Sequence, residues 1–188
     1  MHEFFRYVEL GFTHVLPSGA DHIFFILALY FFKSDLKAVV VQCTLFTIAH
    51  TLTLALSVAG VLIPNPSIVE PLIALSIFVA AVENIVSENV NRIRMAVVFF
   101  FGLVHGMGFA AGLQAIEPGR TVLVSSLLGF NLGVELAQLS VLFGAWLAVG
   151  AWFSRKSWYQ AAVAYPFSVI IACVALYWTI TRIINPVS

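Results

Sequence analysis

The sequence predicts an all-α membrane protein with six transmembrane helices. Of its 188 residues, 61% are hydrophobic and only 10% are charged, which is far from the composition of an ordinary globular domain. Apolar stretches long enough to cross the hydrocarbon layer recur along the chain, separated by short polar or proline-containing segments. Nine basic and nine acidic residues cancel, so the composition gives no indication of nucleic-acid binding. The expected partner of the chain is the lipid bilayer.

The first span is expected at residues 12–32 and is interrupted. It follows residues 1–11, whose alternating aromatic and charged side chains are typical of a short helix in the membrane interface. The apolar run 20–32 would rise only about 20 Å as a helix, too short for a hydrocarbon layer of about 30 Å. To span, the helix must continue back through Gly19 and Pro17, and a proline inside a helix kinks or breaks it. The first span is therefore predicted to be broken there.

The remaining five spans follow in order along the chain. They are expected at residues 38–63, 68–87, 95–115, 121–153 and 158–184. The fifth span is long enough that it must tilt or protrude. Six of the nine lysine and arginine residues fall in the loops on one side, which places both termini outside the cytoplasm by the positive-inside rule. No signal peptide is visible at the amino end, so the first apolar helix is expected to serve as the insertion signal.

Two segments in the middle of the chain that end in histidine resemble each other. The segment FTIAH ends at His50 and is followed by Glu83 in the next span. The segment FGLVH ends at His105 and is followed by Glu135 in the span after it. Spans 2–3 and spans 4–5 would then have the same orientation, as in a parallel repeat. An internal duplication would explain this similarity, and chance similarity between two short segments is the alternative.

Ionisable side chains inside the apolar spans indicate an ion path. A charged group at mid-membrane costs about 3 kcal/mol or more unless it is paired. His50, His105 and Glu135 fall near the middle of their spans, and Glu83 lies in the inner half of its span. No lysine or arginine is expected at a depth where it could pair with Glu83, Glu135 or Asp21. The expected partner of these carboxylates is a bound cation.

The broken first span supplies further candidate ligands. On a straight helix His14 and His22 would lie about 11 Å apart, too far to share one ion, so the break is what could bring them together. The candidate metal ligands are His14, Asp21, His22, His50, Glu83, His105 and Glu135. The candidate supporting residues, which would hydrogen-bond between helices, are Asn84, Asn131 and Gln138. Imidazole and carboxylate without thiolate suit Ni²⁺, Co²⁺, Zn²⁺ or Fe²⁺ better than Cu⁺ or Ca²⁺.

Four segments of the chain resemble the HupE/UreJ family of small bacterial membrane proteins. They are HVLPSGADH at 14–22, IAHTLT at 48–53, VEN at 82–84 and GLVHGMGF at 102–109. The first segment is also similar to the signature of nickel/cobalt permeases, a histidine followed by Asp-His. The resemblance covers the chain from Gly11 to the sixth span. It implies secondary uptake of nickel or cobalt, with the bacterial inner membrane as the location.

Three functions are compatible with these observations. The first is a six-span permease, in which the ion enters at the broken span, passes the mid-membrane histidines and Glu135, and leaves past Glu83. The second is an intramembrane zinc-dependent metallohydrolase, in which a histidine-bound Zn²⁺ activates water, although no HExxH segment is present. The third is a metal sensor or accessory protein that binds without transporting. The sequence leaves the oligomeric state open, a homo-oligomer included.

Overall fold

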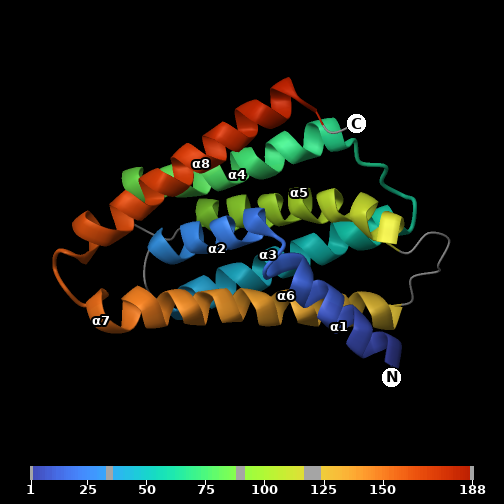
Figure 1. Ribbon diagram of the computed structural model, residues 1–188, viewed down its shortest axis with the longest axis horizontal. Helices are drawn as coiled ribbons and strands as arrows, with labels where there is room; N and C mark the ends of the chain where they lie inside the picture. The colour runs from blue at the N-terminus through green and yellow to red at the C-terminus, as the bar shows by residue number, and fades with distance from the viewer. Residues whose placement is uncertain (1, 33–35, 88–91, 117–123, 187–188) are drawn as a thin grey trace.

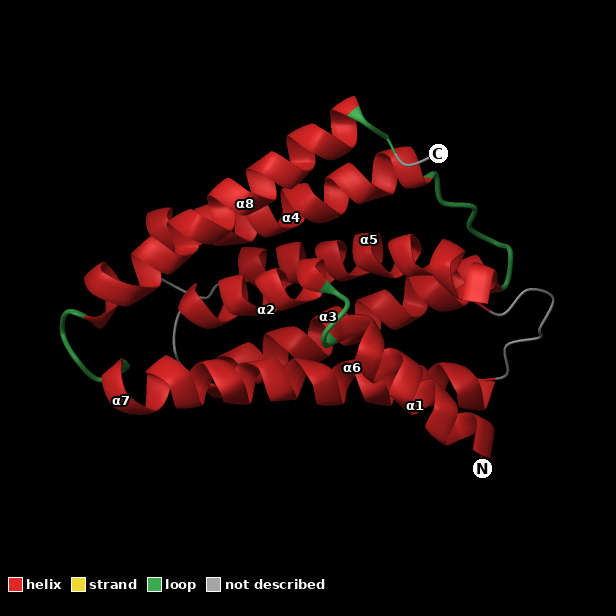
Figure 2. Ribbon diagram, in the orientation of Figure 1, coloured by secondary structure: helices red, strands yellow, loops and turns green. Residues whose placement is uncertain are grey.

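The structure is a bundle of helices aligned with its long axis (Figure 1). The computed structural model describes residues 2–32, 36–87, 92–116 and 124–186, with residues 2 and 110–116 described by their backbone alone. Five helices in these ranges are long and apolar enough to cross a membrane, and a bent pair at the amino end makes a sixth span if it is counted as one. The described residues form helices and loops without strands (Figure 2). The chain is a multi-pass all-α membrane protein, as the sequence predicts.

The first span is broken where the sequence predicts the break. Helices α1 (His2–Val15) and α2 (Ala20–Phe32) meet at an angle of 71°. Pro17 has no backbone N–H with which to continue α1. Gly19 lies so close to the end of α1 that a Cβ atom there would overlap the carbonyl oxygen of His14. The break lies near the middle of the bundle (Figure 1), and it therefore exposes two helix ends inside the protein.

Helix α1 packs along α6 (Val124–Ala145) and includes the segment expected in the membrane interface. Gly129 and Gly133 of α6 lie directly against backbone carbonyl groups of α1, and Gly11 of α1 lies against the carbonyl group of Phe130. A Cβ atom at any of these three glycines would overlap the backbone of the other helix. Close backbone contact is typical of helix pairs in membranes that carry small residues at their interface. This contact fixes the position of the last turn of α1.

The other helices pack mainly in pairs. Their bounds are α3 (Leu36–Val58), α4 (Pro66–Val86), α5 (Arg92–Ile116), the π-helical turn Trp146–Gly150 that leads into α7 (Ala151–Phe153), a second π-helical turn Gln160–Ala164, and α8 (Tyr165–Ile184). In Figure 1, α4 and α8 lie together at the top of the view, and α5 and α2 lie below them. Helix α3 ends at Val58 rather than at 63, because the chain turns at Gly60, whose φ is 71°.

Small residues bring α5 against α3. Gly102 and Gly106 of α5 face the backbone carbonyl groups of Phe46 and His50, and neither position has room for a Cβ atom. The hydroxyl group of Thr53 in α3 donates a hydrogen bond of 2.7 Å to the carbonyl oxygen of residue 103 in α5. The close approach places the middle of α5 beside the middle of α3.

A row of hydrogen bonds joins α3 to α6. The hydroxyl groups of Thr44, Thr47 and Thr51 donate to Glu135 Oε1 at 2.9 Å, Gln138 Oε1 at 3.3 Å and Asn131 Oδ1 at 2.5 Å, respectively. The third predicted supporting residue, Asn84 of α4, donates to the carbonyl oxygen of Ala28 in α2 at 2.8 Å and to Ser168 Oγ in α8 at 3.0 Å. All three predicted supporting residues thus hydrogen-bond between helices.

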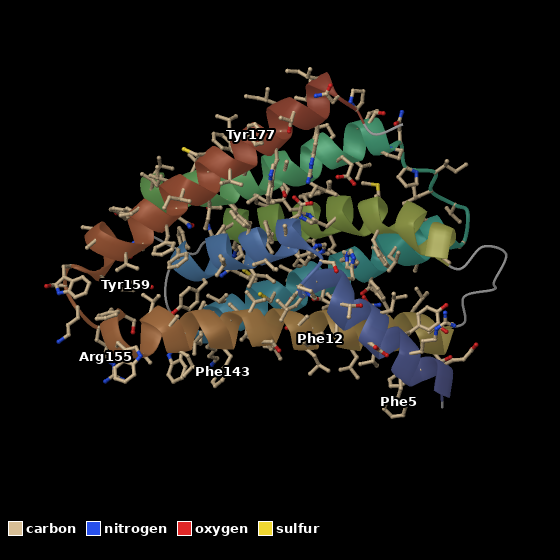
Figure 3. All side chains as sticks on the ribbon, in the orientation of Figure 1. Phe5, Phe12, Phe143, Arg155, Tyr159 and Tyr177 are labelled. Atoms are coloured by element: carbon tan, nitrogen blue, oxygen red, sulfur yellow. The ribbon has the colours of Figure 1, made fainter. Side chains whose placement is uncertain are left out.

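The outer surface of the bundle is apolar. Phe5, Phe143 and Tyr177 point away from the helices (Figure 3), and each is more than half exposed. Exposed apolar side chains on this scale are typical of a surface that faces lipid rather than water. The polar side chains that matter for function must therefore be sought inside the bundle.

Candidate metal centre

Three histidines from three helices meet at the break. They are His14 in the last turn of α1, His22 in the first turn of α2 and His50 in α3. One ring nitrogen from each can be chosen so that all three lie within 4.8 Å of one another. The ring centroids of His14 and His22 are 4.7 Å apart, and those of His22 and His50 are 5.8 Å apart. We call these three residues the histidine cluster.

Four ring nitrogens of the histidine cluster are buried and have no hydrogen-bond partner among the described residues. They are Nε2 of His14, Nε2 of His22 and both ring nitrogens of His50. Leaving a buried polar atom without a partner costs free energy. A transition-metal ion binds imidazole nitrogen at about 2.1 Å, so two nitrogens bound to the same ion lie at most about 4.2 Å apart. The three nitrogens of the cluster, which lie within 4.8 Å of one another, are close to that limit, so the donor set fits a metal ion.

His105 of α5 flanks the cluster. Its ring centroid is 5.2 Å from that of His22, and its Nδ1 lies 2.8 Å from the carbonyl oxygen of Phe101. When Nδ1 donates this hydrogen bond, Nε2 carries the lone pair, and Nε2 is buried without a partner in the described part of the chain. A backbone carbonyl group is a common orienting partner for a metal-bound histidine. The Nε2 atom of His105 is thus available to bind a metal ion. His105 is nevertheless not one of the three histidines whose ring nitrogens lie within 4.8 Å of one another.

Aromatic rings surround these histidines on several sides. The ring centroid of Phe109 lies 3.9 Å from that of His14, and the ring centroid of Phe46 lies 5.0 Å from that of His105 and 5.9 Å from that of His22. Apolar walls limit the access of water and strengthen the interactions of a charge with its ligands.

A cavity of about 400 Å³ reaches the histidines from one side. His14, His22 and His105 form part of its wall. The lining also includes three charged side chains, Asp21, Glu70 and Arg182. The cavity therefore places these charged side chains and the imidazoles around one space.

The expectation that no basic side chain pairs with the carboxylates is wrong for Asp21. Arg182 of α8 contacts both carboxylate oxygens of Asp21 through Nη2, at 3.0 and 3.1 Å. Arg182 lies in the last turn of α8 and Asp21 in the first turn of α2, and the long arginine side chain reaches from one helix end to the other. Asp21 shares the cavity with the histidines, and its charge is balanced there by a residue of the chain itself.

The same expectation is wrong for Glu83. Arg94 Nη1 lies 2.7 Å from Glu83 Oε2, and Arg94 Nε donates to Gln42 Oε1 at 2.8 Å. The guanidinium group also stacks 3.8 Å from the ring centroid of Phe32. The fourth span predicted from the sequence begins at residue 95, which leaves Arg94 in the loop before it. In the structure α5 begins at Arg92, and Arg94 lies inside the bundle with 0% of its side chain exposed.

Glu135 lies apart from the histidine cluster. Its carboxylate accepts the hydrogen bond from Thr44, at a partly exposed position between α3 and α6. Among the described residues, the group that could hold a metal consists of histidines alone. The structure thus brings His14, His22 and His50 together with His105 beside them, and it gives Glu83 and Glu135 other contacts. The pairing of Arg182 with Asp21 is not among the predictions from the sequence. The signal that could have indicated it is an isolated charge near the end of an otherwise apolar span.

Comparison with known proteins agrees with the resemblance of the motifs. The family model described as HupE / UreJ protein matches residues 1–182, nearly the whole chain. A search of curated proteins found no match. A search of solved structures found none either. At the level of the family, the match supports a role in metal transport. This chain belongs to the HupE/UreJ family.

Proposed function

We propose that this chain is a secondary transporter of a divalent transition metal, with nickel as the first candidate and cobalt and zinc as the others. The observation that carries the proposal is the histidine cluster, a group of buried ring nitrogens without hydrogen-bond partners at the break of a helix. Transporters commonly bind ions at discontinuous helices near the middle of the membrane. Imidazole ligands favour nickel, cobalt and zinc over the harder cations.

The cavity and its charges suggest the route of the ion. We infer that the ion enters through the cavity past Asp21 and is then held by His14, His22 and His50, with His105 beside them. We assign Glu83 and Glu135 to the contacts between helices, because each has a partner of its own. The chain has no nucleotide-binding motif, so an ion gradient or the membrane potential would supply the driving force. We place it in the bacterial inner membrane with both termini outside the cytoplasm.

Flux into liposomes tests the proposal. The purified chain would be stripped of metal with a chelator and reconstituted, and Ni²⁺ entry would be followed with a dye trapped inside. The variant His22→Ala is expected to reduce flux at least tenfold, because removing one of three ligands opens the site. His2→Ala is the matched control, since His2 begins α1 and the cluster is at its other end. Wild-type flux in His22→Ala would contradict the proposal, and metal binding without flux would favour a sensor or accessory role.

A further inference from the structure

Three charged side chains from three helices meet at the mouth of the cavity. Arg182 of α8 binds both carboxylate oxygens of Asp21 in α2. Its Nη1 also donates to the backbone carbonyl oxygen of Glu70 in α4 at 3.1 Å and lies 3.4 Å from Oε2 of the Glu70 carboxylate. The three side chains are only 22–29% exposed. A single guanidinium group thus bridges two carboxylates where the cavity begins.

The mouth retains an attraction for cations. Two carboxylates face one guanidinium group, so these three charges sum to one negative charge. The same cavity is lined by His22 and His105, whose Nε2 atoms are buried and find no partner among the residues that the structure describes. Carboxylates at the mouth and unpaired imidazole nitrogens further inside form a continuous series of cation ligands. We call Asp21 and Glu70 together the mouth site.

We propose that Arg182 occupies the mouth site as an internal cation, and that a divalent metal ion displaces its guanidinium group on the way to the histidines. The proposal rests on the proposed transport function and adds to it the residue that an arriving ion must replace. At equal distance, a divalent ion attracts a carboxylate twice as strongly as a guanidinium group does. Arg182 therefore holds the mouth closed to monovalent cations and yields to divalent ones.

The displaced guanidinium group has a second position nearby. Its Cζ atom lies 5.6 Å from the ring centroid of Trp178, about one turn earlier on α8. An arginine over an aromatic face gains a cation–π interaction at about this distance. A side-chain rotation would let Arg182 leave the carboxylates and stay over Trp178. The exchange of guanidinium for metal then requires no movement of α8 itself.

Binding of Co²⁺ to the mouth site tests the proposal directly. The histidine cluster is first disabled with His50→Ala, because His50 does not line the cavity. In that background we expect Arg182→Gln to lower the Kd for Co²⁺ about fivefold, since the competing cation is gone. Arg182→Lys keeps the charge and is expected to stay within about twofold of the parent. Adding Glu70→Gln to Arg182→Gln should reverse the gain. Arg155→Gln, at an exposed position after α7, is the matched control.

An unchanged or raised Kd in Arg182→Gln would overturn the proposal. A second measurement guards against a variant that fails to fold. Ile73, 6% exposed, lines the cavity, and Ile73→Cys can be labelled with a charged thiol reagent once Cys43 and Cys173 have been replaced by alanine. We expect Arg182→Gln to increase the labelling rate at least threefold and Arg155→Gln to leave it unchanged. Equal rates in the two variants would also overturn the proposal.

The mouth site and the transport function can fail separately. If the flux of His22→Ala equals that of wild type, the proposed function is wrong, whatever Arg182 does. If His22→Ala abolishes flux while Arg182→Gln changes neither Kd nor labelling, only the mouth site is wrong. The two sets of variants share no substitution, so each result bears on one claim.

Discussion

The imidazole rings of His14 and His22 lie 4.7 Å apart between centroids, although they belong to helices that meet at 71°. On a straight helix these residues would be about 11 Å apart. The break at Pro17 and Gly19 therefore assembles the histidine cluster, and His50 completes it from α3. The packing of α1 on α6, and of α2 on α4 and α6, holds the two halves of the broken helix in place.

Gly19→Ala should weaken metal binding. A Cβ atom at this position overlaps the carbonyl oxygen of His14, so the end of α1 must move away from α2. We expect the Kd for Ni²⁺, measured by equilibrium dialysis, to rise at least tenfold, as is typical when the support of a metal ligand is disturbed. Gly144→Ala is the control, because a Cβ atom there has no neighbour within 4 Å in the described ranges of the chain. Equal Kd values for the two variants would show that the break tolerates a side chain.

Gly133→Ala should destabilise the protein by separating α1 from α6. The added Cβ atom overlaps the carbonyl oxygen of Val8 in α1. Overpacking of this kind costs about 1–3 kcal/mol of unfolding free energy. Denaturant titration in detergent micelles, followed by circular dichroism, would measure the loss against Gly144→Ala, which lies on the same helix. A stability equal to that of the control would mean that α1 is not held by this contact.

Arg94→Met should be more harmful than the double variant Arg94→Met/Glu83→Gln. The single change leaves the Glu83 carboxylate without its closest cation, which is expected to cost about 3 kcal/mol. Removing both charges avoids much of that cost, so the two changes should not add. A double-mutant cycle on unfolding free energies measures the coupling. Strictly additive effects would contradict an interaction between the two residues. Ni²⁺ binding by the double variant should match wild type, because Glu83 is outside the histidine cluster.

Thr51→Val should have a small effect. It removes the hydrogen bond to Asn131 between α3 and α6, and such bonds in membrane proteins contribute about 0.6 kcal/mol on average. The unfolding free energy should fall by about that amount, with an unchanged Kd for Ni²⁺. Ser140→Ala is a suitable control, since the Ser140 hydroxyl donates to the carbonyl oxygen of Leu136 within its own helix. A large loss of Ni²⁺ affinity in Thr51→Val would instead give this row of hydrogen bonds a part in metal binding.

Much of the fold can be predicted from the sequence because long apolar stretches and helix breakers are local signals. Pro17 and Gly19 mark the break, and the length of the apolar run after them shows that the helix must continue through it. Gly102 and Gly106 likewise indicate the close contact of α5 with another helix. The proximity of His14 and His22 follows from the break.

The partners of the carboxylates could not be predicted in the same way. In spans that are apolar all round, the sequence does not show which face of a helix points inward. The contact of Glu135 with Thr44 of α3 therefore cannot be predicted from the sequence. The apolar pattern of the fourth span begins at residue 95, which leaves Arg94 outside it, whereas α5 begins at Arg92. The ends of helices are harder to predict from a sequence than their presence. The pairing of Arg182 with Asp21 depends on how α8 packs, which the sequence does not show.

X-ray absorption at the nickel edge would test the central claim most directly. The purified chain loaded with Ni²⁺ is expected to show about three imidazole ligands, the number in the histidine cluster. His50→Ala should lose one of them and bind less metal, whereas His2→Ala should give the wild-type spectrum. Oxygen ligands alone in the wild-type protein, or a spectrum unchanged by His50→Ala, would contradict a site built from these histidines.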